Sequence, residues 1–375
     1  MKTGIIILTN LNKLKADAVH VKNLLQSFDK LNFQYDLITS STEDKQYKFK
    51  LLNIFKKIIG RCVLMTKVYS RQKEFSAFYL RDWFFAYLLS FLNIKYIFEV
   101  NGLLIYEGLI RGYARPGSLR IRILRIIENR VAKNANKIVC VSRGMKNYLV
   151  NQYNANKDNI LVAPNAANLD VFNNNVQKVD LCLDEDDFIV GWTGSFDAYH
   201  GISDLIEIAK LLRDNNQRHI KFLIVGDGKE KERILKITQT EKINHYFVFV
   251  GAKQWKEVPS YISNADICLS LDKRSTENLE YRNIIGVTTV KVYEYLALGK
   301  PVLAYQLGDA KDFYEGQKVG WVCQPSVAKL YKKIIEISNN SKQIEEFSHK
   351  ALQTAIKDYN WDKTAKKIID FILQN

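Results

Sequence analysis

Lys291 and Glu294 stand three residues apart in a segment that is predicted to be a helix from Thr289 to Leu298. The first N–H groups of a helix have no partner inside it, so the amides from Val290 to Val292 form an anion site. Lys291 puts a cation in the first turn, where the helix dipole disfavours it unless an anion is also bound. Glu294 lies on the same face, and its carboxylate can accept two hydrogen bonds from a ribose diol. The pair suits a nucleotide diphosphate, but a surface helix with a Lys–Glu pair fits these residues equally well.

Both ends of this helix are marked in the sequence. Thr288 or Thr289 is suited to the N-cap position. Gly299 is expected to end the helix, and Pro301 prevents it from resuming. The loop that precedes the helix is therefore predicted to leave the strand at Ile267–Leu271.

Strands and helices that position this segment alternate along the whole chain. In the first half, apolar runs predict strands at Gly4–Thr9, Tyr35–Thr39, Tyr96–Val100 and Lys137–Val141, with a helix at Ala18–Leu31. In the second half, strands are predicted at Phe188–Trp192, Ile220–Val225, Phe247–Val250, Ile267–Leu271 and Pro301–Tyr305, with helices at Ser203–Leu212, Lys229–Thr238 and Val258–Asn264. This alternation is typical of parallel sheets covered by helices on both faces.

The fold class predicted from this pattern is α/β, with two Rossmann-like, doubly wound domains. We expect a first domain at 1–168 completed by a returning helix at 356–375, a linker at 169–186 rich in Asn and Asp, and a second domain at 187–355. Two such domains are expected to face each other and to bind ligands in the cleft between the carboxyl ends of their strands.

Polar residues at predicted strand ends and cleft-facing helices form a second set of candidates. Glu99 and Asn101 follow the strand at 96–100, His20 lies on the first helix, and Arg81 interrupts the apolar run at 77–100. We interpret Glu99 and Asn101 as candidate catalytic residues, and His20 and Arg81 as acceptor-side residues. For His20, an ordinary helix-face histidine fits as well.

Several classes of protein are disfavoured. Five scattered cysteines with no Cys-x-x-Cys spacing indicate free thiols in a reducing compartment. Gly226-Asp227-Gly228 is not a dinucleotide fingerprint. No signal peptide and no uncharged apolar stretch of about 18 residues is evident, so we expect no membrane span. No acidic metal-binding pair is evident either, so we expect no metal. We also expect no cofactor.

Positive charge is concentrated in the first half of the chain. Residues 1–168 hold 27 Lys and Arg against 11 Asp and Glu, whereas the remainder holds 28 against 29, which together give the net +15.

Lys48–Arg61 mixes lysines with large apolar residues and is predicted to contact an anionic membrane. In Ser118–Val131 the apolar stripe formed by Leu119, Ile123, Ile126 and Ile127 is expected to face the domain core. Little aromatic–basic interleaving is present, so no nucleic-acid partner is expected.

The segment Lys291-Val-Tyr-Glu294-Tyr-Leu-Ala-Leu-Gly299-Lys-Pro301-Val resembles the donor-site helix of the retaining GT-B glycosyltransferases of family 4. Further landmarks follow in the order of that family, at Val141-Ser142, Ala163–Phe172, Gly191–Phe196, His200-Gly201, Val225–Gly228, Phe249–Gly251 and Tyr359–Trp361. The resemblance implies that Glu294 binds the donor ribose, that the amides of Val290–Val292 hold the diphosphate, and that Ala252 and Lys253 border the base. It also implies donor contacts from Gly194, Ser195, Phe196, His200, Asp227 and Thr289.

This sequence departs from the family pattern at several positions. A second carboxylate, which touches the sugar in the family, is replaced by Gly286, and two cations are replaced by Ser195 and His200. The loop Asn10–Asp17 lacks the usual glycine pair, and the stretch Phe98–Gly102 lacks a histidine. Leaving-group stabilisation is therefore expected from Lys291 and the helix N-terminus, with Lys273, Arg274 and Arg282 as further candidates.

The function implied by the resemblance is retaining transfer of a hexosyl group from a nucleoside diphosphate sugar to a saccharide or lipid-linked saccharide, in the assembly of cell-surface polysaccharide or glycolipid. A cytoplasmic protein peripheral to the inner face of the cell membrane is expected. Two alternatives stay open at this point: a GT-B nucleotide-sugar epimerase, and a non-catalytic protein that binds sugar or nucleic acid.

Overall fold

The computed structural model describes residues 2–8, 11, 16–39, 50–196, 201–272 and 274–374, and for Ala16 and residues 50–57 it describes the backbone only. His200, Lys273 and most of the loop at 10–17 lie outside the described residues. The chain divides into two compact units, Met1–Pro164 with Asp362–Asn375, and Asn165–Trp361.

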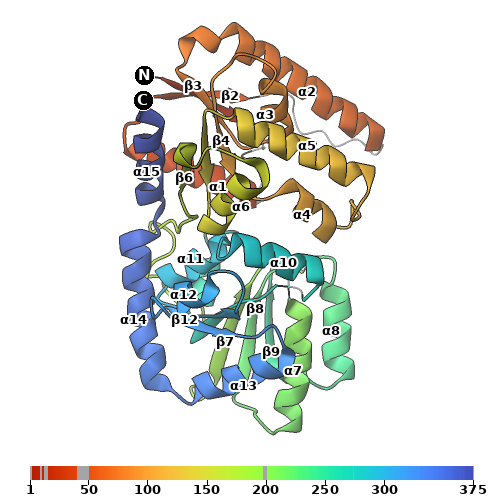
Figure 1. Ribbon diagram of the computed structural model, residues 1–375. Helices are drawn as coiled ribbons and strands as arrows, with labels where there is room; N and C mark the ends of the chain where they lie inside the picture. The colour runs from red at the N-terminus through yellow and green to blue at the C-terminus, as the bar shows by residue number, and fades with distance from the viewer. Residues whose placement is uncertain are drawn as a thin grey trace. The chain divides into compact units, whose positions relative to one another are not determined.

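The first unit is built on a six-stranded sheet in which every strand pair is parallel, in the order β2-β1-β3-β4-β5-β6 (Figure 1). Its strands are β1 (Thr3–Ile7), β2 (Tyr35–Thr39), β3 (Ala77–Leu80), β4 (Tyr96–Val100), β5 (Lys137–Cys140) and β6 (Ile160–Val162). Its helices are α1 (Ala16–Lys30), α2 (Lys50–Ser70), α3 (Trp83–Leu89), α4 (Leu104–Ile110), α5 (Leu119–Asn134) and α6 (Arg143–Tyr153), and α15 (Trp361–Leu373) begins at its boundary.

The second unit repeats the architecture with the strand order β12-β11-β10-β7-β8-β9, again fully parallel. Its strands are β7 (Phe188–Thr193), β8 (Ile220–Val225), β9 (Phe247–Gly251), β10 (Ile267–Ser270), β11 (Val302–Tyr305) and β12 (Gly320–Cys323). Its helices are α7 (Ile202–Asp214), α8 (Lys231–Thr240), α9 (Val258–Ile262), α10 (Thr276–Ile285), α11 (Val290–Ala297), α12 (Ala310–Tyr314), α13 (Val327–Ser338) and α14 (Ser341–Asp358).

Two hydrophobic clusters cover the two faces of the second sheet. One cluster joins the sheet to α7, α8 and α13, and the other joins it to α9, α11, α12 and α14, while Phe347 of α14 belongs to the first cluster. The segment predicted as a linker packs on this second face: Leu169, Val176 and Leu181 contact the cluster, and Val179 N–H donates to Ser260 O at 3.1 Å. The doubly wound α/β class predicted from the alternating pattern is confirmed in both units.

Helix α11 begins and ends close to its predicted limits. Thr289 takes the N-cap position, but its side chain makes no capping hydrogen bond. At the other end Gly299 adopts a φ of 68°, and Lys300 N–H donates to Tyr295 O at 2.9 Å, which closes the last turn. Because Thr289 does not cap the helix, its first amides are left for another acceptor.

Candidate functional site

The loops that follow β7 and β8 are joined at the carboxyl edge of the second sheet. Phe196 N–H donates to Asp227 O at 2.9 Å, and Gly194 N–H donates to Val225 O at 3.1 Å. A Cβ at Gly226 would lie 1.9 Å from Gly194 O, so only glycine allows this approach. The close packing places both loops next to the strand end at Thr193, which Lys291 also reaches.

Lys291 is a half-buried cation at the start of α11. Its Nζ donates to Thr193 O at 3.3 Å and lies 5.2 Å from the centre of the Trp192 ring. No carboxylate of the described residues forms an ion pair with it. Burial lowers its pKa to about 8. An anion bound here would favour the charged form of Lys291 and supply the partner that it lacks.

The first amides of α11 complete this anion site. The N–H groups of Val290 and Lys291 donate to no described group, whereas Val292 N–H already donates to Thr289 O at 3.1 Å. The sequence predicts three free amides at the start of this helix, and the structure leaves two of them without an acceptor among the described residues.

Glu294 is buried one turn further along α11, with 8% of its surface exposed. Its Oε1 accepts a hydrogen bond from Trp255 Nε1 at 2.7 Å, and burial raises its pKa to about 7. The Trp255 ring packs on Phe172 at 5.5 Å between centroids. Sequence reasoning missed Trp255, although a single tryptophan among the polar residues that follow Gly251 is a signal that could have pointed to it.

Two cations named as possible replacements already have partners within the second unit. Arg274 forms a two-pronged pair with Asp204 at 3.0 and 2.9 Å, and Asp204 also accepts from Tyr305 Oη at 2.5 Å. Arg282 pairs with Asp272 at 2.9 Å. These guanidiniums are therefore less available to a ligand than Lys291, and Lys273 lies outside the described residues.

At Gly286, where the family carries a carboxylate, the structure places the carboxylate of another residue. Gly286 has a φ of 66°, and a Cβ added to it would meet Asp309 Oδ1 at 2.1 Å. The same oxygen accepts from Val287 N–H at 2.9 Å. A carboxylate is thus present at this point of the loop, but it comes from the residue before α12.

The remaining donor-side candidates lie on the same edge of the sheet with partners of their own. Asp227 accepts from Gly228 N–H at 2.7 Å and Lys231 Nζ at 2.6 Å, and Lys231 holds the pKa of this carboxyl below its usual value. Ala252 is exposed, and Lys253 Nζ lies 4.6 Å from the centre of the Tyr261 ring. Ser195 is half-buried, and Phe196 is buried.

In the first unit the two acceptor-side candidates, His20 and Arg81, and the catalytic candidate Asn101 meet at the carboxylate of Glu99, the other catalytic candidate. Glu99 Oε1 lies 2.7 Å from His20 Nε2 and 3.4 Å from Arg81 Nε, and it accepts from Asn101 Nδ2 at 2.6 Å. Glu99 Oε2 accepts from Tyr79 Oη at 2.6 Å. These residues come from α1, from the ends of β3 and β4, and from the turn after each strand.

The charge state of this cluster follows from its partners. Glu99 is 2% exposed, and burial by itself would raise its pKa, but Arg81 and then His20, with the hydrogen bonds from His20 and Asn101, hold the pKa well below its usual range. Glu99 is therefore ionised and saturated with donors. It is better suited to hold His20, Arg81 and Asn101 in place than to take up a proton.

Neither a metal cluster nor a membrane span is found among the described residues. No three His, Cys, Asp or Glu side chains of residues 2–8, 11, 16–39, 50–196, 201–272 and 274–374 are grouped as metal ligands. Within the same ranges, every helix is too short or too polar to cross a bilayer.

Comparisons with known proteins place the chain in a family. Residues 18–171 match the model of Glycosyltransferase Family 4, and residues 173–358 match that of Glycosyl transferases group 1. The chain is 24% identical over 365 residues to the uncharacterized glycosyltransferase MJ1178 of Methanocaldococcus jannaschii, with 92% of this chain and 90% of that protein covered.

Solved structures share the fold over the whole chain. The sucrose-phosphate synthase of Thermosynechococcus elongatus superposes with a TM-score of 0.74 at 16% identity, covering 99% of this chain and 98% of the other. The Anabaena protein HepE in complex with UDP gives 0.70 at 13% identity, covering 99% of each chain. With two family models matched in succession over residues 18–171 and 173–358 and a Rossmann-like parallel sheet in each unit, the chain belongs to the family 4, group 1 glycosyltransferases.

Proposed function

We propose that this glycosyltransferase moves a hexosyl group, with retention of configuration, from a nucleoside diphosphate sugar to a saccharide or lipid-linked saccharide. The observation that carries the proposal is the half-buried Lys291, which lacks a carboxylate partner among the described residues. It lies beside two open amides at the start of α11 and one turn before the buried Glu294. A similar fold has been solved with UDP, which supports a nucleotide donor.

The proposed donor roles follow from the charges of the second unit. Lys291 and the amides of Val290 and Lys291 bind the diphosphate and stabilise the negative charge that develops on the departing phosphate. Glu294 accepts hydrogen bonds from the ribose diol through the oxygen that Trp255 leaves open. Since Lys291 supplies the positive charge, we propose that no metal or cofactor is needed.

The acceptor is proposed to bind the first unit near the Glu99 cluster. Glu99 holds His20, Arg81 and Asn101 at fixed distances, and polar side chains fixed in this way suit a hydroxyl-rich acceptor. We further propose that the acceptor is part of a cell-surface polysaccharide or glycolipid. The enzyme would then work at the cytoplasmic face of the cell membrane, drawn there by the charge of residues 1–168.

A donor panel tests the proposal. UDP-, GDP- and ADP-sugars are tested for thermal stabilisation and for slow hydrolysis in the wild type and in Glu294→Ala. We expect one donor to stabilise the wild type, with the anomeric configuration retained in the released sugar, and Glu294→Ala to lose most of that stabilisation. Stabilisation by none of the donors, or an unchanged response in Glu294→Ala, would refute the donor site, and release of an epimerised sugar would make the protein an epimerase.

A further inference from the structure

Helix α5 carries two apolar faces. Ile121, Leu124, Ile127 and Val131 are buried, as a core-facing helix requires. Leu119, Ile123 and Ile126, however, are 72%, 48% and 56% exposed. The expectation that the stripe through these three residues packs into the domain core is therefore wrong. The core is filled by the neighbouring face, which leaves three large apolar side chains at the i, i+4 and i+7 positions in solvent.

Helix α3 and the turn after it present a second stripe with the same spacing. Phe84, Leu88 and Phe91 are 43%, 42% and 58% exposed. Helices α3 and α5 pack against each other. We name the six exposed side chains of the two stripes, together with Arg122 and Arg125, the α3–α5 face.

Arg130 of α5 connects the two stripes through contacts with the turn after α3. Its guanidinium lies 3.6 Å from the centre of the Phe91 ring, and it donates to Ser90 Oγ at 2.7 Å and to Ser90 O at 3.0 Å. The contact fixes the end of one stripe next to the end of the other. The α3–α5 face is therefore one preformed surface and not two separate patches.

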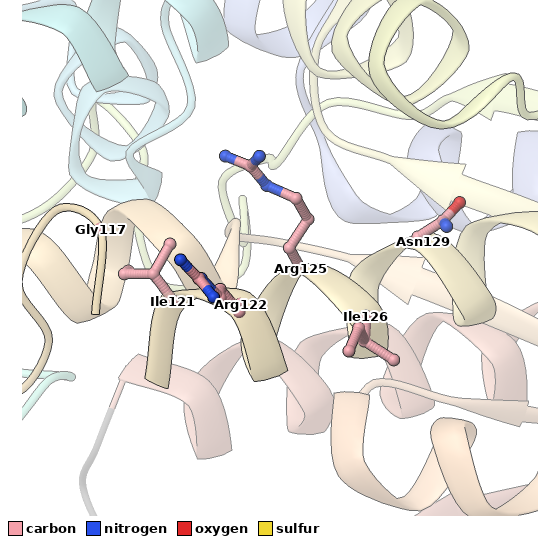
Figure 2. Close-up of a pocket in the computed structure, with 6 residues that line it drawn as sticks. All are labelled: Gly117, Ile121, Arg122, Arg125, Ile126 and Asn129. Atoms are coloured by element: carbon pink, nitrogen blue, oxygen red, sulfur yellow. The ribbon is translucent and has the colours of Figure 1, made fainter. Parts of the chain in front are cut away.

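Cations flank the α5 stripe without acidic neighbours on the same helix. Helix α5 has five basic residues in the sequence LRIRILRIIENRVAKN, and its single acid, Glu128, is fully buried. Arg122 and Arg125 are exposed and form no ion pair with any residue that the structure describes. They line a pocket of about 440 Å³ with Gly117, Ile121, Ile126 and Asn129. Figure 2 shows Arg125 projecting away from the helix at this pocket.

The second unit offers no comparable surface. Among its described residues Ile356 is the single large apolar side chain that is more than about a third exposed. The excess positive charge is likewise confined to residues 1–168. Clustered apolar exposure on a soluble fold marks an interaction surface, and flanking arginines specify an anionic partner.

We infer that the α3–α5 face docks on an anionic lipid bilayer, with the two apolar stripes inserted among the lipids and Arg122 and Arg125 on the phosphates. This inference rests on the proposed function at the membrane, and it names the surface through which the protein binds the bilayer. Arginine stems are long enough to reach the head groups while the neighbouring apolar side chains lie deeper. Lys48–Arg61, the segment favoured from the sequence, lies mostly outside the described side chains, although Ile58 and Ile59 at its end are also exposed.

Flotation with lipid vesicles tests the inference. The whole protein is mixed with vesicles of phosphatidylcholine alone or of phosphatidylcholine with phosphatidylglycerol, and the partition coefficient is measured. We expect binding to the anionic vesicles that weakens with salt. The double variant Arg122→Gln with Arg125→Gln should lower the coefficient by roughly 30-fold, because each cation near an anionic surface contributes about fivefold. Ile123→Asp should abolish flotation.

Matched controls come from the second unit. Ile356 is 53% exposed on α14, so Ile356→Asp makes the same change on a surface outside the α3–α5 face. Lys329 and Lys332 are exposed and spaced like the two arginines, so Lys329→Gln with Lys332→Gln is the charge control. Both controls should float like the wild type. Equal loss in controls and test variants would overturn the inference, as would wild-type flotation of the arginine variant.

Two further readouts separate this inference from the proposed function. Thermal stabilisation by the donor should be unchanged in Ile123→Asp, since the α3–α5 face lies in the first unit. If the variant keeps its donor response and its folding temperature but still floats, the docking surface is wrong and the donor site stands. If Ile123→Asp instead converts a dimer into a monomer in solution, the face is an interface between copies of this chain, and the lipid inference is overturned.

Discussion

Glu99 of the first unit and Glu294 of the second are both buried near the carboxyl edge of their sheet, and the two have opposite surroundings. Glu99 has Tyr79, Asn101, His20 and Arg81 around its two oxygens. Arg81 and then His20, with the hydrogen bonds from His20 and Asn101, hold its pKa well below the usual range. Glu294 has Trp255 on one oxygen and a pKa raised to about 7 by burial. The comparison teaches that burial alone does not define a role: Glu99 is already satisfied by the protein, whereas Glu294 has capacity left for a ligand.

Removing the saturated carboxylate should have the largest effect. Glu99→Ala leaves Arg81, His20 and Tyr79 without their common acceptor, and loss of one member of a buried charge pair typically costs about 3–5 kcal/mol. We expect urea unfolding at neutral pH to show a loss of that size in the first unit. Glu74→Ala is the matched control, because Glu74 pairs with Arg71 on the surface. A loss no larger than the control's would contradict the proposed organising role of Glu99.

The same cluster predicts the direction of the pH dependence of stability. The folded-state pKa of Glu99 lies below that of the unfolded chain, so its ion pairs contribute fully above the ordinary glutamate pKa. That contribution should be lost as the pH falls towards the folded-state pKa. The stability difference between wild type and Glu99→Ala, measured by unfolding, should therefore shrink at acid pH.

Removing the Lys291 cation from the proposed donor site of the second unit should weaken donor binding and leave folding unchanged. Lys291→Met deletes a charged donor that has no carboxylate partner among the described residues, and hydrogen bonds to charged groups are worth a factor of about 10–100 in affinity. Calorimetric titration with the best donor of the panel at pH 7 measures this loss. Lys300→Met changes a lysine whose pKa is also lowered by burial, but beyond the other end of α11, and it should bind normally. Equal weakening of donor binding in both variants would contradict the proposed role of Lys291 in binding the diphosphate.

Donor affinity should have a bell-shaped pH profile. Glu294 accepts from the ribose as a carboxylate, so affinity should rise as the pH passes its pKa of about 7. Lys291 binds the diphosphate as a cation, so affinity should fall as the pH passes about 8, although a bound anion will move that limb upwards. Titrations from acid to alkaline pH measure both limbs. Glu294→Gln should flatten the acid limb, and a profile unchanged by that variant would separate Glu294 from donor binding.

The donor site could be predicted from the sequence because its signals are local. The Lys291–Glu294 spacing, Gly299 and Pro301 define the helix and its polarity within 11 residues. Short elements, and elements that follow one another without a polar break, carry no comparable local signal in the sequence. Strand β3 has four residues and leads almost directly into α3, so both merge into one apolar run, and β6, β12 and α10 were likewise not predicted.

Partners that come from distant parts of the chain could not be predicted. Asp309 reaches Val287 from 22 residues away, and Trp255 reaches Glu294 from 39 residues away. On α5, two apolar arcs of similar length compete for the core, and periodicity alone does not decide which one is buried. The structure decides it through the packing of α3, α4 and α6 on this helix.

The smallest effect is expected from Trp255→Phe, which keeps a ring against Phe172 but removes the N–H that Glu294 accepts. That hydrogen bond lowers the pKa of Glu294, so its loss should move the acid limb of the binding profile to higher pH. At pH 7 the donor should bind about fivefold more weakly, which corresponds to one hydrogen bond of about 1 kcal/mol. Above the new pKa the affinity should return close to that of the wild type. Weakening by the same factor at every pH would instead mean that Trp255 acts through packing, and that Glu294 keeps its charge without help from the indole.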